Sequence, residues 1–137
     1  MRIIVDAYGG DNAPEAVLRG CRMAADQWKC EIILTGDGEK LRARAAELGV
    51  SLEGMTIAEA PDVFPMEAEP TAIMKQYKDC SMARGLQMLA EGGGEAFVSA
   101  GSTGALVVGG TLIVKRIKGV KRPAIGTVVP CKDGCFM

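Results

Sequence analysis

The sequence predicts a doubly wound α/β fold with a mainly parallel sheet, and three observations support this prediction. Short apolar runs alternate with segments of helical periodicity along most of the chain. Two glycine-rich turns, at residues 9–10 and 101–104, follow apolar runs and therefore fall at the carboxyl ends of strands, where such sheets bind ligands. The 137 residues are 48% hydrophobic, which is enough to bury one core. We therefore expect residues 1–137 to form a single α/β domain.

The elements are expected in alternating order. Apolar runs predict strands at residues 2–7, 30–35, 55–60, 95–99 and 124–129. Apolar residues at helical spacing predict helices at residues 14–28, 39–48, 81–90 and 105–117, the first starting near Asn12 or Ala13 and the next two stopping at glycines. Residues 61–78 carry three prolines and predict a long irregular loop, of a length that is usually functional. Gly109-Gly110 weaken the last helix, and close packing against a neighbouring helix or subunit would offset that cost.

Composition excludes several functional classes. The 16 basic residues nearly balance the 17 acidic ones, so no global field favours nucleic acid or an anionic membrane surface. The apolar run at residues 2–7 is too short for a secretion signal, and the apolar stretch at 105–114 is too short for a membrane span. We therefore expect a cytoplasmic protein.

The cysteine and histidine content limits the chemistry further. Five cysteines without C-x-x-C spacing predict reduced structural thiols: Cys21, Cys30, Cys80, Cys131 and Cys135. The chain has no histidine, which removes the commonest zinc partner and any Ser-His or Cys-His nucleophile within these residues. Whatever chemistry takes place here must proceed without imidazole.

The turn at Gly101, Ser102, Thr103 and Gly104 is the strongest candidate for an anion site. It lies between a predicted strand and a predicted helix, where backbone N–H groups converge. Glycines would allow positive φ angles and a close approach of the backbone to a phosphate, and the two hydroxyls can cap the helix or donate to the ligand. The same residues also occur in strand-to-helix turns that bind nothing, and this alternative stays open.

A second turn, Asp6-Ala7-Tyr8-Gly9-Gly10-Asp11, places two carboxylates around a glycine pair. Asp6 and Asp11 could bind magnesium, accept hydrogen bonds from a ligand, or cap the following helix, and capping is the favoured interpretation. No further oxygen ligands are identified, so we predict no metal site. We expect Asp6, Gly9, Gly10 and Asp11 to shape the pocket.

Three motifs together resemble one known family: IIVDAYGGDNAPEAVLRG at 3–20, EPTAIMKQYKDCSM at 69–82, and VSAGSTGALVVGGT with RIKGVKRPAIGTVVP within 98–130. They are similar to the PlsX family of phosphate acyltransferases. The resemblance implies a Rossmann-like three-layer α/β/α sandwich related to phosphotransacetylase and isopropylmalate dehydrogenase-like folds. It also implies transfer of a fatty acyl group from acyl carrier protein to inorganic phosphate, giving acyl phosphate for phospholipid synthesis. Members are cytoplasmic homodimers that work at the membrane surface and need no organic cofactor.

The chain departs from the family pattern in places. Tyr8 stands where methionine is common, Ser102 where asparagine is common, and Cys80 where serine is usual. Because Ser102 is shorter than asparagine, a direct side-chain contact there is in doubt, whereas the backbone cradle is kept. Family members are roughly twice as long, and after a predicted turn at 132–134 the apolar residues 135–137 start an element that is not completed. We expect the N-terminal part of a longer protein, and its activity alone is left open.

The basic residues provide the catalytic candidates. Phosphate near neutral pH already carries negative charge, so it can attack a thioester carbon without histidine. Lys75 and Lys78 could close over the anion or meet the phosphopantetheine arm and the acidic carrier protein, or they could be solvated loop residues. Arg122 is the next basic candidate. Two other functions stay open: a coenzyme A-dependent phosphate acetyl- or butyryltransferase, and a non-catalytic anion-binding or dimerisation module.

Overall fold

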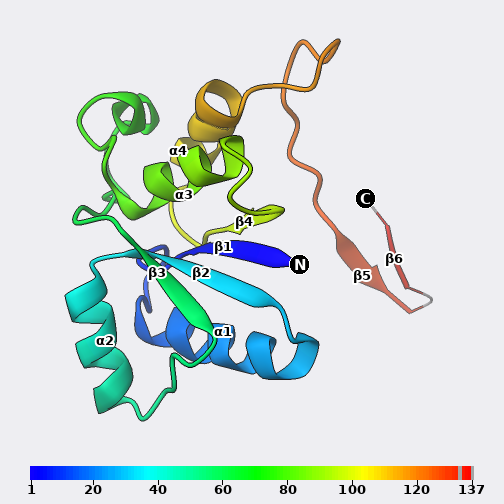
Figure 1. The fold of residues 1–137 in the computed structure, drawn as a ribbon. Coiled ribbons are helices and arrows are strands. Elements are labelled where there is room, and N and C mark those ends of the chain that lie inside the picture. The colour runs from blue at the N-terminus through cyan, green and yellow to red at the C-terminus, as the bar shows by residue number, and fades with distance from the viewer. Residues whose placement is uncertain (133, 137) are drawn as a thin grey trace.

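A four-stranded parallel sheet forms the centre of the molecule. The structure is a computed structural model that describes residues 1–132 and 134–136. The sheet has the strand order β3-β2-β1-β4 (Figure 1). Its strands are β1 (Arg2–Asp6), β2 (Glu31–Gly36), β3 (Met55–Glu59) and β4 (Ala96–Val98). Every pair is parallel, as the alternation of apolar runs and helical segments predicts.

Helices cover both faces of this sheet (Figure 1). One face carries α1 (Glu15–Trp28) and α2 (Gly38–Glu47), and the other carries α3 (Ser81–Ala90) and α4 (Thr103–Gly109). Each face has its own apolar core: Leu18 and Leu41 pack on the first, Ile73 and Leu86 on the second. The three-layer α/β/α arrangement predicted for the chain is therefore confirmed.

The register of β1 and β4 positions the candidate site. Val5 lies opposite Val98, so Asp6, the last residue of β1, lies beside Ser99, which directly follows β4. Both glycine-rich turns thus emerge at the same edge of the sheet, as expected for adjacent parallel strands.

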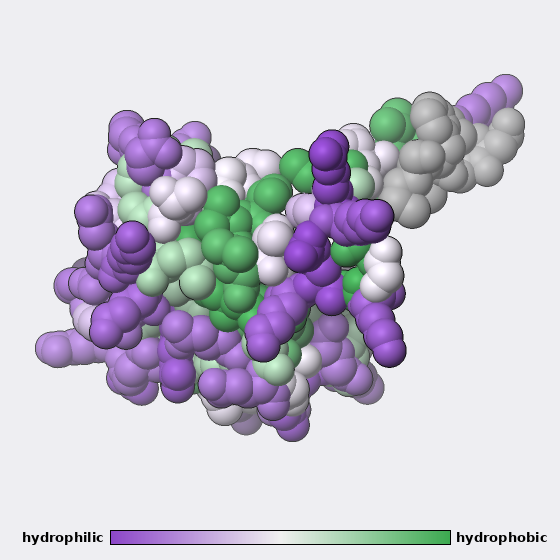
Figure 2. Space-filling view, turned by 90° about the horizontal axis from the view of Figure 1, so that it is seen from above, coloured by the Kyte–Doolittle hydropathy of each residue, from purple (hydrophilic) through white to green (hydrophobic). Residues whose placement is uncertain are grey.

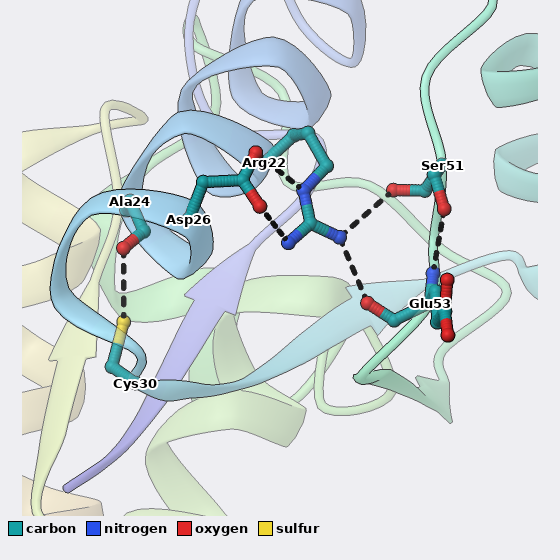
Figure 3. A network of polar contacts seen from close by, with 6 residues as sticks. All are labelled: Arg22, Ala24, Asp26, Cys30, Ser51 and Glu53. Carbon is teal, nitrogen blue, oxygen red and sulfur yellow. Dashed lines mark hydrogen bonds and ion pairs between the residues drawn. The ribbon is translucent and has the colours of Figure 1, made fainter.

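Arg22 of α1 forms hydrogen bonds within its own helix and with the loop before β3, as Figure 3 shows. Its guanidinium donates to both carboxylate oxygens of Asp26, at 3.1 and 2.5 Å, within the same helix. It also donates to the main-chain oxygen of Glu53 at 2.8 Å and, at 3.5 Å, to that of Ser51. Arg22 therefore ties α1 to the loop that precedes β3.

The predicted end of α2 at Gly49 is confirmed, whereas the capping interpretation at the start of α1 is not. The Asp37 side chain caps α2 by accepting from the N–H of Lys40 at 3.1 Å, and Gly49 follows that helix with a φ of 65°. By contrast, α1 begins after Pro14, whose position offers no side-chain cap, so the interpretation of Asp11 as a capping residue is wrong. Proline lacks a side-chain acceptor, and the chain starts its helix without one.

The segment predicted as an irregular loop contains a short helix. A 3₁₀ turn, η1 (Pro70–Met74), begins at a proline, which is favourable in a first turn because its missing N–H has no partner there. The main chain of residues 61–80 is also tied to α3, since Asp62 forms a parallel bridge with Cys80. Tertiary contact therefore orders a segment whose prolines predict irregular structure.

The helix that follows the candidate anion turn is shorter than predicted. It begins at Thr103, and α4 passes after Gly109 into a π-helical turn, η2 (Gly110–Val114). The helical turn ends at Val114, three residues before the predicted end at 117, and Lys115 follows it with a φ of 75°. Within the described residues, no helix combines the length and apolar character needed to cross a bilayer.

The fifth strand of the parallel sheet, predicted at 124–129, is not formed. Only β5 (Val129–Cys131) is a strand there, and it pairs antiparallel with β6 (Gly134–Phe136), away from the main sheet (Figure 1). A local hairpin needs only a short turn, whereas parallel pairing needs a long return crossover. Of the predicted turn at 132–134 and the apolar residues 135–137, Asp133 and Met137 lie outside the described residues.

Candidate functional site

A chain of hydrogen bonds joins the two glycine-rich turns. Asp6, the last residue of β1, is buried, and the Ser99 hydroxyl donates to its Oδ2 at 2.7 Å. The Ser99 oxygen in turn accepts from the N–H of Gly101 at 3.1 Å. The other carboxylate oxygen, Asp6 Oδ1, accepts from the N–H of Tyr8 at 3.3 Å. Asp6 thus holds its own turn and, through Ser99, the turn on the neighbouring strand.

Gly9 fits against this hydrogen-bonded group because it has no side chain. A Cβ at this position would lie 2.7 Å from both Asp6 Oδ2 and Ser99 Oγ, and 2.9 Å from the Gly101 nitrogen. Gly10 has a φ of 103°, a conformation that disfavours residues with a Cβ. The two turns therefore interlock, and both glycines of the first turn are needed for it.

The glycines of the second turn act differently from the prediction. Gly101 and Gly104 do not have positive φ angles, so the expectation of a left-handed backbone there is wrong. Close packing explains them instead. A Cβ on Gly104 would lie 2.7 Å from Pro70 Cγ, and one on Gly101 would lie 3.0 Å from Met82 Cε. The first turn of α4 is thus pressed against η1 and α3.

A cavity of about 200 Å³ opens where the turns meet. Asp6, Gly9, Gly10 and Gly101 line one side of it. The other side is formed by residues that the sequence did not single out for the site, namely Val63, Phe64, Pro65, Met66, Ser81 and Met82. The 69–82 motif contains two of them, and its Cys80-Ser81 pair at a helix start is the signal that could have found Ser81.

The N–H groups around the cavity are not equally available. In α3, the N–H of Ser81 donates to the main-chain oxygen of Asp62 at 2.9 Å, and that of Ala83 donates to Cys80 Sγ at 3.4 Å. Two of the N–H groups in the first turn of α3 are therefore already bonded within the protein.

The start of α4 is more open. There Ser102 accepts from the N–H of Ala105 at 3.4 Å through its hydroxyl, and from that of Leu106 at 2.9 Å through its carbonyl. The N–H groups of Ser102, Thr103 and Gly104 find no acceptor among the residues that the structure describes. Three consecutive N–H groups that follow Gly101 in the chain are thus left without an acceptor in the part of the chain that the structure describes.

The two lysine candidates lie apart from this cavity. Lys75 borders a separate hollow of about 470 Å³ along η1, together with Glu69 and Gln76. The Lys78 ammonium is exposed and lies 3.9 Å from Asp79 Oδ2. Asp11 and Arg122 are also exposed. The structure therefore brings together Asp6, Gly9, Gly10 and Gly101 around the cavity, and Ser102, Thr103 and Gly104 follow Gly101 in the chain. The other charged candidates lie at the surface: Asp11, Lys75, Lys78 and Arg122.

Two ionisable side chains near the turns, those of Cys80 and Tyr8, have pKa values raised in favour of their neutral forms. Burial raises the pKa of the Cys80 thiol, and the nearby Asp6 carboxylate adds to this effect. Burial also raises the pKa of Tyr8, with a further contribution from Asp37. Cys21, Cys30 and Cys80 are free and buried, as predicted for reduced structural thiols. A thiolate nucleophile is therefore disfavoured at Cys80.

Comparison with known protein families gives a match over the whole chain. The family model described as fatty acid synthesis protein matches residues 1–137. The chain belongs to this family. The match includes the turns at 9–10 and 101–104, and it confirms the resemblance to the PlsX phosphate acyltransferases.

Curated relatives agree with the family match. The chain is 44% identical over 138 residues to the phosphate acyltransferase of Caldicellulosiruptor bescii. This alignment covers 100% of this chain and 41% of the relative. It is 44% identical over 135 residues to the phosphate acyltransferase of Acetivibrio thermocellus, covering 98% of this chain and 40% of the relative. That of Elusimicrobium minutum is 39% identical over 138 residues, covering 100% of this chain and 40% of the relative. The chain thus spans about two fifths of the length of these relatives.

Proposed function

We propose that this chain supplies the phosphate site of an enzyme that transfers a fatty acyl group from acyl carrier protein to inorganic phosphate. A phosphate oxygen attacks the thioester carbonyl carbon, a C–O bond forms, the C–S bond breaks, and the carrier protein leaves as its thiolate. The products are acyl phosphate and free carrier protein. Family membership and the relatives named phosphate acyltransferase support this reaction.

The observation that carries the proposal is the row of N–H donors at Ser102, Thr103 and Gly104, which have no acceptor among the described residues and directly follow Gly101 of the cavity wall. Backbone donors and the helix dipole favour an anion at this end of the helix. The Asp6 charge opposes an anion, but both of its oxygens already accept hydrogen bonds, which partly offsets the repulsion. We propose Gly101, Ser102, Thr103 and Gly104 as the phosphate-binding residues, with Asp6, Gly9 and Gly10 shaping the pocket.

The rest of the reaction is assigned by chemistry and exposure. Phosphate is already ionised near neutral pH and needs no histidine to deprotonate it, which fits a chain without histidine. Lys75 and Lys78 offer exposed positive charge on the segment around η1, suited to an acidic carrier protein or to the substrate anion. We propose that these two lysines contact the acyl carrier protein or the substrate anion. We also propose that the full enzyme is a cytoplasmic homodimer associated peripherally with the membrane.

A chimaeric enzyme tests the proposal. In the Caldicellulosiruptor bescii relative, the matched N-terminal two fifths are replaced by this chain. Acyl phosphate is then trapped with hydroxylamine after incubation with phosphate and acyl-acyl carrier protein. We expect product formation, and loss of most of it in the Gly101→Val variant, whose side chain fills the cavity.

Two further arms complete the test. The variant Gly110→Ala is the matched control, because a Cβ at Gly110 meets no atom within 4 Å, and it should leave the rate unchanged. A chimaera that forms product only from acyl-coenzyme A would contradict the carrier protein as donor. A folded chimaera without product from either thioester would contradict the acyl transfer itself.

A further inference from the structure

We infer that Ser99 is a positioning residue of the phosphate site, and that it acts by fixing the Gly101 turn to Asp6. The inference rests on the proposed function, since it concerns how that site is held in place. Ser99 follows β4 directly, whereas Asp6 ends β1, so their contact at 2.7 Å joins two strands whose loops have no covalent link near this edge.

The Ser99 hydroxyl has only one hydrogen, which it donates in the hydrogen bond to Asp6. With that hydrogen directed at Asp6 Oδ2, the Ser99 oxygen presents lone pairs to the N–H of Gly101, which it accepts at 3.1 Å. Ser99 therefore has no proton left to donate to a phosphate. Its effect on the ligand is indirect, through the orientation of the Gly101 peptide.

The neighbouring glycine confirms how tightly this arrangement is packed. A Cβ at Gly9 would lie within 2.9 Å of all three partners, the Asp6 carboxylate, the Ser99 hydroxyl and the Gly101 nitrogen. The three groups thus form one wall of the turn, with Gly9 and Gly101 both bordering the cavity. If Ser99 loses its hydroxyl, the Gly101 N–H loses its acceptor, and the peptide that leads into the free donors at 102–104 can rotate.

The fold offers a matched serine without the carboxylate partner. The Ser51 hydroxyl also accepts from the N–H two residues later, that of Glu53, at 3.2 Å (Figure 3). Ser51 lies in the exposed loop before β3 and its hydroxyl has no other partner in the described part of the chain. Removal of this hydroxyl therefore costs a turn hydrogen bond of the same type, far from the cavity.

The test is a titration of the whole 137-residue chain with inorganic phosphate, followed by NMR at the amides of residues 101–105. We expect Ser99→Ala to weaken phosphate binding about tenfold, the loss expected for one hydrogen bond. Ser99→Thr keeps the hydroxyl and should restore binding, and Ser51→Ala should bind as the wild type does. If Ser99→Ala fails to fold, Ser99→Cys replaces it, since a thiol is a weaker partner for both neighbours.

A double-mutant cycle with Asp6→Ala shows whether the effect passes through Asp6. An alanine side chain has no acceptor, so this variant removes the hydrogen bond from the Ser99 hydroxyl, and Ser99→Ala should then add little to it. Additive losses would overturn the inference. So would a Ser99→Ala chain that melts at a lower temperature but binds phosphate like the wild type, because its role would then be structural only. A wild-type chain that shows no saturable phosphate shift would instead overturn the proposed function, and the inference with it.

Discussion

Gly109 in α4 lies so close to Leu86 in α3 that a Cβ on the glycine would sit 2.4 Å from Leu86 Cδ1. The two helices pack on the same face of the sheet, with Ile73 of η1 beside them. This contact accounts for a glycine in a helix interior, where the residue is otherwise unfavourable. The neighbouring Gly110 has open space around its Cα.

The glycine pair gives a direct test of this packing. We expect Gly109→Ala to destabilise the chain by about 1–3 kcal/mol through overpacking. The matched change Gly110→Ala should be neutral or slightly stabilising, because alanine has the better helix propensity and meets no atom. Urea unfolding curves measure both. Equal effects at the two positions would contradict the close contact.

Arg22 provides a second prediction, because it links α1 to the loop before β3 (Figure 3). A lysine cannot reproduce its forked hydrogen bonds to Asp26 and to the main chain at Glu53. Arg22→Lys should therefore increase amide hydrogen exchange in residues 50–54 severalfold. Arg19→Lys is the control, because Arg19 pairs with Glu15 of its own helix and with no other residue in the described part of the chain. Exchange in that loop should therefore not change.

The cap of α2 should be sensitive to acid. The hydrogen bonds from Lys40 to Asp37 lower the pKa of this carboxyl below its ordinary value. A carboxyl with a lowered pKa stabilises the fold above its unfolded pKa, and that contribution is lost as the pH falls through the folded pKa. Asp37→Ala should lower the melting temperature by a few degrees at pH 7 and by less at pH 3. Glu39→Ala, which removes no cap, should show a smaller difference.

Cys21 should make the fold sensitive to alkali. Burial, with a smaller contribution from Cys30, raises the pKa of the Cys21 thiol to about 11. The fold therefore favours the neutral thiol, and this stabilisation is complete below the unfolded pKa and falls as the pH rises from there toward the folded value. Melting temperatures at pH 7 and 10 measure the loss. In the Cys21→Ala variant the decrease should be smaller, and an equal decrease would assign it to other groups.

Local patterns were sufficient for most of the sheet. The apolar runs that became β1, β2, β3 and β4 were all predicted, because each is short, continuous and bounded by glycine or charge. Helix ends were less accurate, as at α4, which begins at Thr103 and not at Ala105, and whose regular part ends at Gly109. The prediction of a fifth sheet strand at 124–129 failed for a different reason. Its pattern fits a buried strand, but a pattern does not tell which partner a strand will pair with, and here the nearby turn provided a hairpin.

The exposed apolar side chains show the same limit of prediction from sequence patterns. Figure 2 shows apolar side chains gathered on the face seen from above, on the side of the sheet that carries α3 and α4. Val107 and Leu112 are among the exposed apolar residues of the chain. Helical periodicity predicts an apolar stripe, but it cannot say whether the described chain covers all of it.

The sequence by itself determined the class of fold, the two glycine-rich turns and the family, because strand and helix periods and contiguous motifs are local properties. Only the tertiary structure decided how the turns act together. Parallel register places Asp6 beside Ser99, although 93 positions separate them, and the Gly101 peptide is fixed by that contact. It also decided that Gly101 and Gly104 are needed for space and not for positive φ, since the atoms that crowd them, in Met82 and Pro70, come from other elements.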